Sequence, residues 1–158
     1  MRLNKLLNFS TTLIVVMILP GLSCERLSYP KSSIGIVNNS NHTIEFYFAL
    51  GGKGGIIYPD TILNSDLIPP FPSARAGETR YRDFGFSEEK IFDEIPSDTL
   101  SIYIFHPDTL LKYNWKTVIK DYNILKRYDL SFEDLEQLNW QVSYPPNDKM
   151  KGVKMYPK

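Results

Sequence analysis

Few of the residue types that carry out chemistry in enzymes stand in a recognisable pattern in this chain. The two histidines, His42 and His106, each lie beside turn residues, and neither has a cysteine or second histidine at the spacing of a zinc site. None of the serines stands in the Gly-x-Ser-x-Gly pattern that presents a hydrolase nucleophile. We therefore expect no catalytic residue, no metal site and no cofactor. A pair of carboxylates that meets only in the folded chain leaves a small hydrolase open as an alternative.

One residue type with reactive chemistry does occupy an informative position, the single cysteine Cys24. It follows a segment that is typical of a signal peptide, in which Arg2 and Lys5 precede the apolar run LIVVMIL at 13–19. This run is shorter than the roughly 20 apolar residues that a membrane-spanning helix needs. Residues 1–23 are therefore predicted to be a leader that is removed.

The residues around the cleavage point, Leu22-Ser23-Cys24, resemble the lipobox of bacterial lipoproteins in the looser form of the Bacteroidetes. The resemblance implies transfer of a diacylglyceryl group to the thiol of Cys24. Acyl chains bound there would anchor the protein to a membrane, since each buried methylene contributes about 0.8 kcal/mol. With this anchor in place, residues 24–33 would tether the domain close to the membrane. The alternative is an ordinary secretory signal with a free cysteine.

Three tripeptides share the pattern Asp-Thr followed by Ile or Leu, with the threonines at Thr61, Thr99 and Thr109. They resemble the O-glycosylation sites of exported Bacteroidetes proteins, which implies a hydroxyl that accepts a sugar. Ordinary turn chemistry is the alternative, because Asp favours turns and Thr favours strands.

Aromatic residues are abundant, with 10 Tyr, 9 Phe and 2 Trp. A platform of exposed rings would bind carbohydrate by stacking, whereas most aromatic side chains pack into cores. The candidates for ligand stacking are Tyr58, Tyr81, Tyr113, Trp115, Trp140 and Tyr144.

The charge balance argues against a nucleic-acid partner. The whole chain has 18 basic and 18 acidic residues, and removing the leader, with Arg2 and Lys5, leaves a net charge of −2. Nucleic-acid-binding domains usually present a basic face. The same balance argues against electrostatic attraction to anionic lipid as the membrane anchor.

Hydrophobic periodicity predicts a single domain that is mainly β with two short helices, arranged as an antiparallel β-sandwich or a twisted sheet. The first two strands should pair as a hairpin, and each helix begins at a serine, Ser87 or Ser131. The domain is expected over 34–146, followed by a short basic tail at 147–158. The clearest strands lie at 33–37, 43–50, 79–84, 99–105 and 140–144. The strand at 99–105 has bulky apolar residues on both faces, so we expect it to be central, and His106-Pro107-Asp108 is expected to end it. Residues 122–130 are interpreted as either a strand or an extended link.

The C-terminal part, with Tyr128-Asp129-Leu130-Ser131, Leu138-Asn139-Trp140 and Tyr144-Pro145-Pro146, resembles small uncharacterised lipoproteins of the Bacteroidetes. The resemblance implies an address in the cell envelope, most often the outer membrane, and no particular activity. We expect a lipid-anchored, non-catalytic domain that binds a protein partner in the envelope. The alternatives are a carbohydrate-binding accessory lipoprotein and a small envelope hydrolase.

Overall fold

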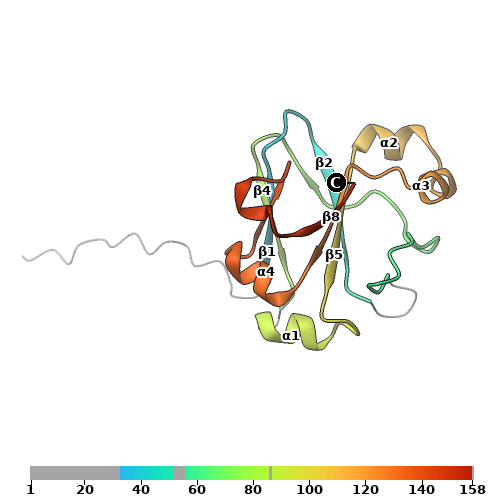
Figure 1. The fold of residues 1–158 in the computed structure, drawn as a ribbon. Helices are drawn as coiled ribbons and strands as arrows, with labels where there is room; N and C mark the ends of the chain where they lie inside the picture. Colours follow the sequence, from blue (N-terminus) through green and yellow to red (C-terminus); the bar gives the residue numbers. More distant parts are fainter. Residues whose placement is uncertain (1–32, 52–55, 86, 158) are drawn as a thin grey trace, which may run out of the picture.

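The structure is a computed structural model that describes residues 33–51, 56–85 and 87–157 (Figure 1). The predicted leader at 1–23, the lipidation site Cys24 and the tether up to residue 32 lie outside the described residues.

Within the described residues, eight strands form two sheets, which confirms the prediction of a mainly β domain built as a sandwich or twisted sheet. The smaller sheet has the order β4 (Thr79–Asp83), β1 (Ser33–Asn38), β7 (Gln141–Tyr144). The larger sheet has the order β3 (Ser73–Ala74), β2 (Ile44–Ala49), β5 (Leu100–Phe105), β6 (Lys126–Leu130), β8 (Lys154–Tyr156). The larger sheet is antiparallel throughout, whereas β1 runs parallel to β7.

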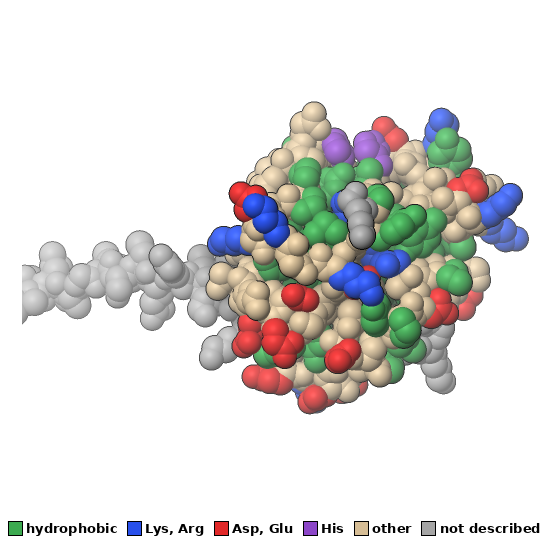
Figure 2. Space-filling view, in the orientation of Figure 1, with side chains coloured by type: hydrophobic (Ala, Val, Ile, Leu, Met, Phe, Trp, Pro, Cys, Tyr) green, Lys and Arg blue, Asp and Glu red, His purple; other side chains and the backbone are tan. Residues whose placement is uncertain are grey.

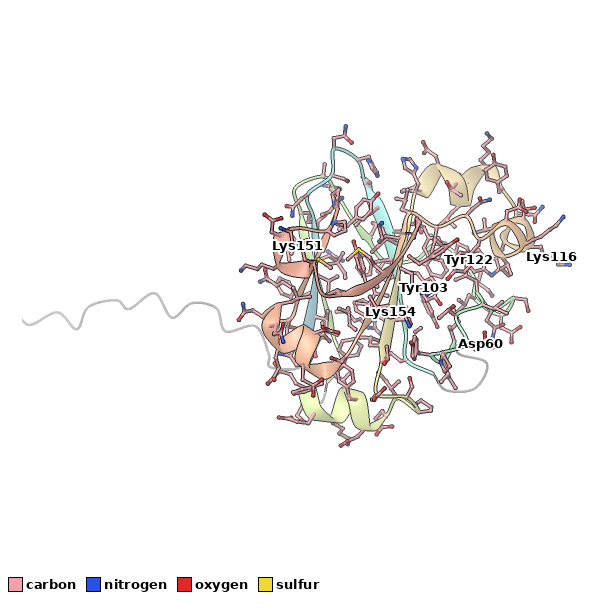
Figure 3. The ribbon with its side chains drawn as sticks, in the orientation of Figure 1. Asp60, Tyr103, Lys116, Tyr122, Lys151 and Lys154 are labelled. Atoms are coloured by element: carbon pink, nitrogen blue, oxygen red, sulfur yellow. The ribbon has the colours of Figure 1, made fainter. Side chains whose placement is uncertain are left out.

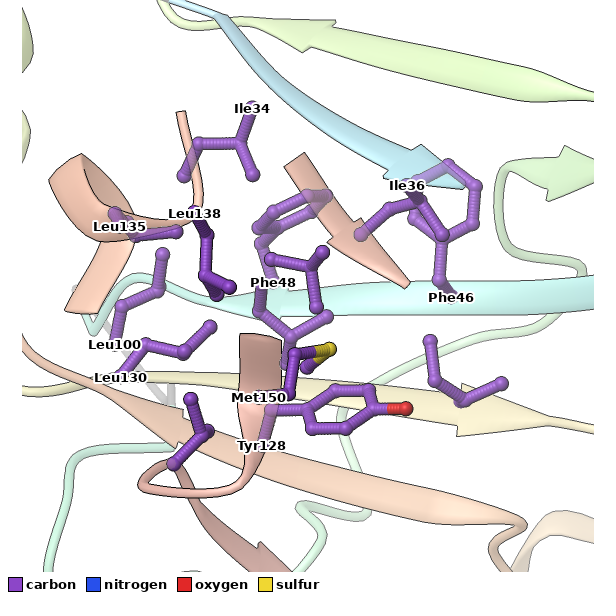
Figure 4. Close-up of a cluster of buried hydrophobic side chains, with 14 of the residues drawn as sticks. Ile34, Ile36, Phe46, Phe48, Leu100, Tyr128, Leu130, Leu135, Leu138 and Met150 are labelled. Atoms are coloured by element: carbon purple, nitrogen blue, oxygen red, sulfur yellow. The ribbon is translucent and has the colours of Figure 1, made fainter. Parts of the chain in front are cut away.

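The main hydrophobic core lies between the two sheets (Figure 4). Alternate residues of β1 and β2 enter it, as the period of two in a strand requires. Each aliphatic side chain that is fully buried there contributes about 1.5–3 kcal/mol to folding. The side chains labelled in the figure are Ile34, Ile36, Phe46, Phe48, Leu100, Tyr128, Leu130, Leu135, Leu138 and Met150.

A second cluster of buried residues covers the opposite face of the larger sheet. Strand β5 supplies Tyr103 and Phe105 to this face, while its residues Ile102 and Ile104 point into the main core. The prediction that β5 is central and buried on both faces is therefore confirmed. The cover consists of the segment after residue 56 and two helices, α2 (Pro107–Lys112) and α3 (Trp115–Asp121).

The described residues form four α-helices rather than the two that we predicted. Both predicted helices are present, as α1 (Glu88–Asp93) and α4 (Phe132–Gln137), and Ser131 forms a capping box with Asp134. Helix α2 was missed because Pro107 was interpreted as the end of a strand. Proline also suits the first turn of a helix, where its missing N–H is not needed.

The predicted hairpin between the first two strands is wrong, because β1 and β2 belong to different sheets. The turn between them is a corner that leads from one sheet to the other. The buried side chain of Asn38 holds it by donating hydrogen bonds to the carbonyl oxygens of His42 (2.8 Å) and Ala74 (2.9 Å). A two-residue turn would instead have kept both strands in one ladder.

The domain also extends beyond the predicted boundary at residue 146. The 3-10 helix η1 (Asp148–Met150) and strand β8 follow, and Met150 and Val153 are buried in the main core. The segment that we expected to be a tail therefore completes the larger sheet, because β8 pairs with β6.

Candidate functional site

A cleft of about 580 Å³ lies in the loop that covers the outer face of the larger sheet. Its volume is within the range of pockets that bind small ligands or side chains. The described residues that line it are Ile56, Ile57, Tyr58, Pro59, Asp60, Ile62, Leu63 and Asn64. Ile56 and Leu63 are buried, whereas Ile62 is 70% exposed. The cleft is therefore mostly apolar and open to solvent on one side.

Side chains from regular elements fasten this loop through its backbone carbonyl groups. Tyr103 on β5 and Tyr122 at the end of α3 both donate hydrogen bonds to the carbonyl oxygen of Thr61, at 3.0 and 3.1 Å. Trp115 at the start of α3 donates from Nε1 to the carbonyl oxygen of Asn64 at 2.9 Å. A loop that is held by a strand and a helix is the usual arrangement of a binding site on a rigid scaffold.

Behind the loop lies a buried ion pair between Arg127 and Asp129, on the outer face of β6. The Asp129 side chain is 0% exposed and the Arg127 side chain 13%. Ser101 on the neighbouring strand donates to Asp129 Oδ1 at 2.7 Å. Arg127 Nη1 donates to the hydroxyl of Tyr122 at 2.7 Å, so the hydrogen-bonded network continues to the loop.

Ionisation at this network follows from burial and hydrogen bonding. Burial disfavours a charged Arg127, but the hydrogen bond to Tyr122 and the charge of Asp129 outweigh it and raise the pKa of Arg127. Burial is also the main cause of the raised pKa of Tyr103. The raised pKa values keep the Arg127 guanidinium charged and the Tyr103 phenol protonated, which preserves their hydrogen bonds.

A basic and aromatic surface adjoins the cleft. The exposed side chain of Lys154 on β8 donates a hydrogen bond to the hydroxyl of Tyr58, which raises the pKa of Lys154. Tyr156, two residues further along β8, lies against Tyr122 with 5.5 Å between ring centroids and beneath the Arg127 guanidinium at 5.7 Å. Figure 2 shows Lys and Arg side chains among hydrophobic ones on this face, and Figure 3 shows Lys154, Tyr103, Tyr122 and Asp60 on the same side of the molecule.

The predicted aromatic platform does not assemble as one surface. Tyr58 lines the cleft and Trp115 fastens its loop, so two of the six candidates belong to this site. The other four lie elsewhere: Tyr81 beside Gly35, Tyr113 beside Lys112, Trp140 against Phe132, and Tyr144 at the edge of His42. Spacing along the chain could not reveal this, because the six residues lie on different elements and sheets.

Several residues of the site were not singled out from the sequence. Arg127 and Asp129 alternate along one strand, a pattern that places them on one face, but the interpretation of 122–130 as strand or extended link remained open. Lys154 and Tyr156 were missed because the C-terminal segment was expected to be a tail. Their own alternation was the only signal for a strand.

The three Asp-Thr-Ile/Leu threonines lie in three different local structures and are all partly exposed. Thr61 belongs to the cleft loop, Thr99 precedes β5 and donates to Asp98 Oδ1 at 3.1 Å, and Thr109 lies within α2. The alternative, in which Asp forms a turn and Thr begins a strand, fits Thr99 but does not fit Thr109. Their O-glycosylation stays a prediction.

The two histidines, separate in the sequence, stack on each other with 4.8 Å between ring centroids. His106 Nδ1 accepts a hydrogen bond from the Asp108 N–H and caps α2. The His42 Nε2 atom is buried, and it has no hydrogen-bond partner among the described residues. Within those residues, no group of three or more His, Cys, Asp or Glu side chains could hold a metal ion.

None of the helices in the described part of the chain is long and apolar enough to cross a membrane. Cys24, on which the lipid-anchoring prediction depends, lies outside that part.

Comparison with known proteins gave no match: no protein-family model fits the chain, and neither a curated protein nor a solved structure is significantly similar to it.

Proposed function

We propose that the chain is an exported lipoprotein, anchored through lipid on Cys24, whose domain binds a protein partner in the bacterial cell envelope without catalysing a reaction. The observation that carries the binding role is the cleft with its fastened loop and its basic, aromatic border. Tyrosine and arginine are the residue types that most often dominate the binding energy of protein interfaces, and a fixed loop loses little entropy on binding.

The distribution of charge supports a lipid anchor over an electrostatic one. Strand β1 begins at Ser33, opposite Asp83, at the end of the domain that also carries α1 and α4. Figure 2 shows acidic side chains gathered at this end. The acidic residues of these elements are Asp83, Glu88, Glu89, Asp93, Glu133, Asp134 and Glu136. An anionic membrane surface would repel these acidic side chains, which supports a hydrophobic anchor rather than an electrostatic one.

The chemistry of the cleft favours binding over hydrolysis. Glycosidases use two carboxyl groups that flank the scissile bond. Among the described residues that line the cleft, Asp60 is the only carboxylate. A glycosidase would therefore need a second carboxylate from outside the cleft.

The experiment has two parts, both on protein from its native membrane. Mass spectrometry is expected to find an N-terminal peptide that begins at an acylated Cys24. A photo-crosslinking amino acid in place of Ile62, which lines the cleft, is expected to capture a discrete envelope protein. The same substitution at Ile68, which is 82% exposed in the same segment but outside the cleft, is the control. An unmodified Cys24, or equal capture at both positions, contradicts the proposal.

Carbohydrate binding is the second candidate, and one observation favours it. Tyr122 and Tyr156 contact each other beside the cleft, and Tyr58 lines it. These three tyrosines therefore lie close to one another, whereas the six residues predicted from the sequence do not. Binding of the purified lipoprotein to envelope polysaccharide that is lost in Tyr156→Ala would support this candidate. Tyr113→Ala, an exposed tyrosine away from the cleft, is the matched control.

A further inference from the structure

We propose that the cleft takes a peptide segment in which a bulky apolar side chain adjoins a carboxylate, with the apolar side chain in the cleft and the carboxylate on Lys154. The inference rests on the proposed binding role and names the chemistry of the ligand. It follows from three features of the cleft and its border.

The first feature is the apolar interior. Ile56 and Leu63 form buried parts of the wall, and Ile57 and Ile62 complete it. An exposed isoleucine at the rim of a hollow offers apolar area that a ligand can remove from water, which is favourable in proportion to the area. Hydrogen bonds from Tyr103, Tyr122 and Trp115 already hold the carbonyl groups of the loop, so the loop does not have to be ordered when a ligand binds.

The second feature is the unmatched positive charge at the border. Asp129 neutralises Arg127 through a close ion pair. Lys154 forms no ion pair within the described part of the chain, and its Nζ donates to the hydroxyl of Tyr58. A lysine ammonium has three donors, so two remain for an incoming carboxylate. Because Tyr58 also lines the cleft, this charge lies directly beside the apolar space.

The third feature selects a peptide over a fatty acid. Asp60 lines the cleft, and one of its carboxylate oxygens accepts a hydrogen bond from the N–H of Ile62 at 3.2 Å. The other oxygen is an acceptor that an amide N–H of a peptide can satisfy. A fatty acid has no donor to offer, and it would leave this carboxylate partly desolvated and unpaired. A peptide can supply all three groups together: an apolar side chain, a carboxylate and an N–H donor.

The test uses the mature acylated protein in detergent micelles and ligand-observed saturation-transfer NMR. The probes are acetyl-Phe-Glu-amide, acetyl-Phe-Gln-amide, acetyl-Ala-Glu-amide and dodecanoate. The Phe-Glu probe is expected to bind about fivefold more tightly than the Phe-Gln probe, the size of one exposed charge pair. It is expected to bind about tenfold more tightly than the Ala-Glu probe, because the ring buries apolar area.

Matched variants assign these differences to the cleft. Lys154→Gln should reduce binding of the Phe-Glu probe to the level of the Phe-Gln probe, whereas Lys151→Gln, an exposed lysine on another segment, should leave it unchanged. Ile62→Ser should weaken binding of the Phe-Glu probe, and Ile68→Ser should leave its binding unchanged. All four side chains are exposed, so each variant is expected to fold.

Three results would overturn the inference: equal affinity for the Phe-Glu and Phe-Gln probes, no effect of Lys154→Gln, or displacement of the peptide by dodecanoate at equal concentration. Capture of a partner at position 62 in cells, together with failure of the peptide probes, would reject the ligand chemistry and leave the proposed function standing. Failure of both would reject the two proposals together.

Discussion

Tyr103 and Tyr122, which lie 19 positions apart on a strand and at the end of a helix, donate hydrogen bonds to the same carbonyl oxygen, that of Thr61. A carbonyl oxygen has two lone pairs, so this pairing satisfies the group fully. The loop that forms the cleft thus depends on two hydroxyl groups that no local sequence pattern connects.

Removing these hydroxyl groups one at a time and together tests their shared role. Tyr103→Phe and Tyr122→Phe are each expected to lower the free energy of unfolding by about 0.5–1.5 kcal/mol. The double variant should lose more than the sum, because only then does the Thr61 carbonyl lose its last side-chain donor. Urea unfolding of the four proteins measures this coupling. Tyr113→Phe, an exposed tyrosine, is expected to change stability little, and strictly additive losses would contradict the shared role.

The buried ion pair provides a second test. Asp129→Asn keeps the hydrogen bond from Ser101 but leaves the Arg127 charge without its partner, and breaking a buried pair in this way costs about 3–5 kcal/mol. Asp148→Asn removes the partner of Lys151 at a site where the side chain is 94% exposed. That change is expected to cost less than about 1 kcal/mol. Equal losses of unfolding free energy in the two variants would show that the Arg127–Asp129 pair is effectively solvated.

Stability should fall at alkaline pH. Burial raises the pKa of Tyr103 and Tyr128 above the ordinary value of 10.0. Above that pH the unfolded chain releases these phenolic protons while the folded chain retains them, so the free energy of unfolding decreases as pH rises. The slope is about 1.4 kcal/mol per pH unit for each tyrosine.

Urea unfolding at a series of pH values between about 8 and 11 measures this slope around the ordinary tyrosine pKa. In the Tyr103→Phe variant, the free energy of unfolding should fall less steeply with pH, because only one of the two buried tyrosines remains. A stability that stays constant through this range would mean that the buried phenols ionise as readily as exposed ones.

The two predicted helix starts differ in a way that substitution can detect. Ser131 Oγ accepts from the Asp134 N–H at 3.2 Å, whereas the Ser87 side chain makes no capping hydrogen bond. Ser131→Ala is therefore expected to lower the free energy of unfolding by about 1 kcal/mol. Ser87→Ala should change it by a few tenths at most, in line with ordinary surface substitutions. Thermal unfolding of both variants, compared with the unmodified protein, separates the two cases.

Patterns within a single element were predictable from the sequence because they depend on neighbours along the chain. The alternation of Leu100, Ile102 and Ile104 with bulky residues identified a central strand, and Ser131 with Asp134 identified a helix start. Both follow from backbone geometry, which places every second strand residue on one face and the third residue of a helix within reach of its cap. The mainly β class followed from the sum of such patterns.

The partners of these elements were decided only by the tertiary structure. The two strands expected to form a hairpin went to different sheets, because Asn38 turns the corner through a hydrogen bond to the distant Ala74. The cleft likewise depends on the hydroxyl groups of Tyr103 and Tyr122 reaching Thr61, and on Lys154 arriving beside Tyr58 from the far end of the chain. Such contacts form when distant segments pack together to bury a common core, and spacing along the sequence carries no record of them.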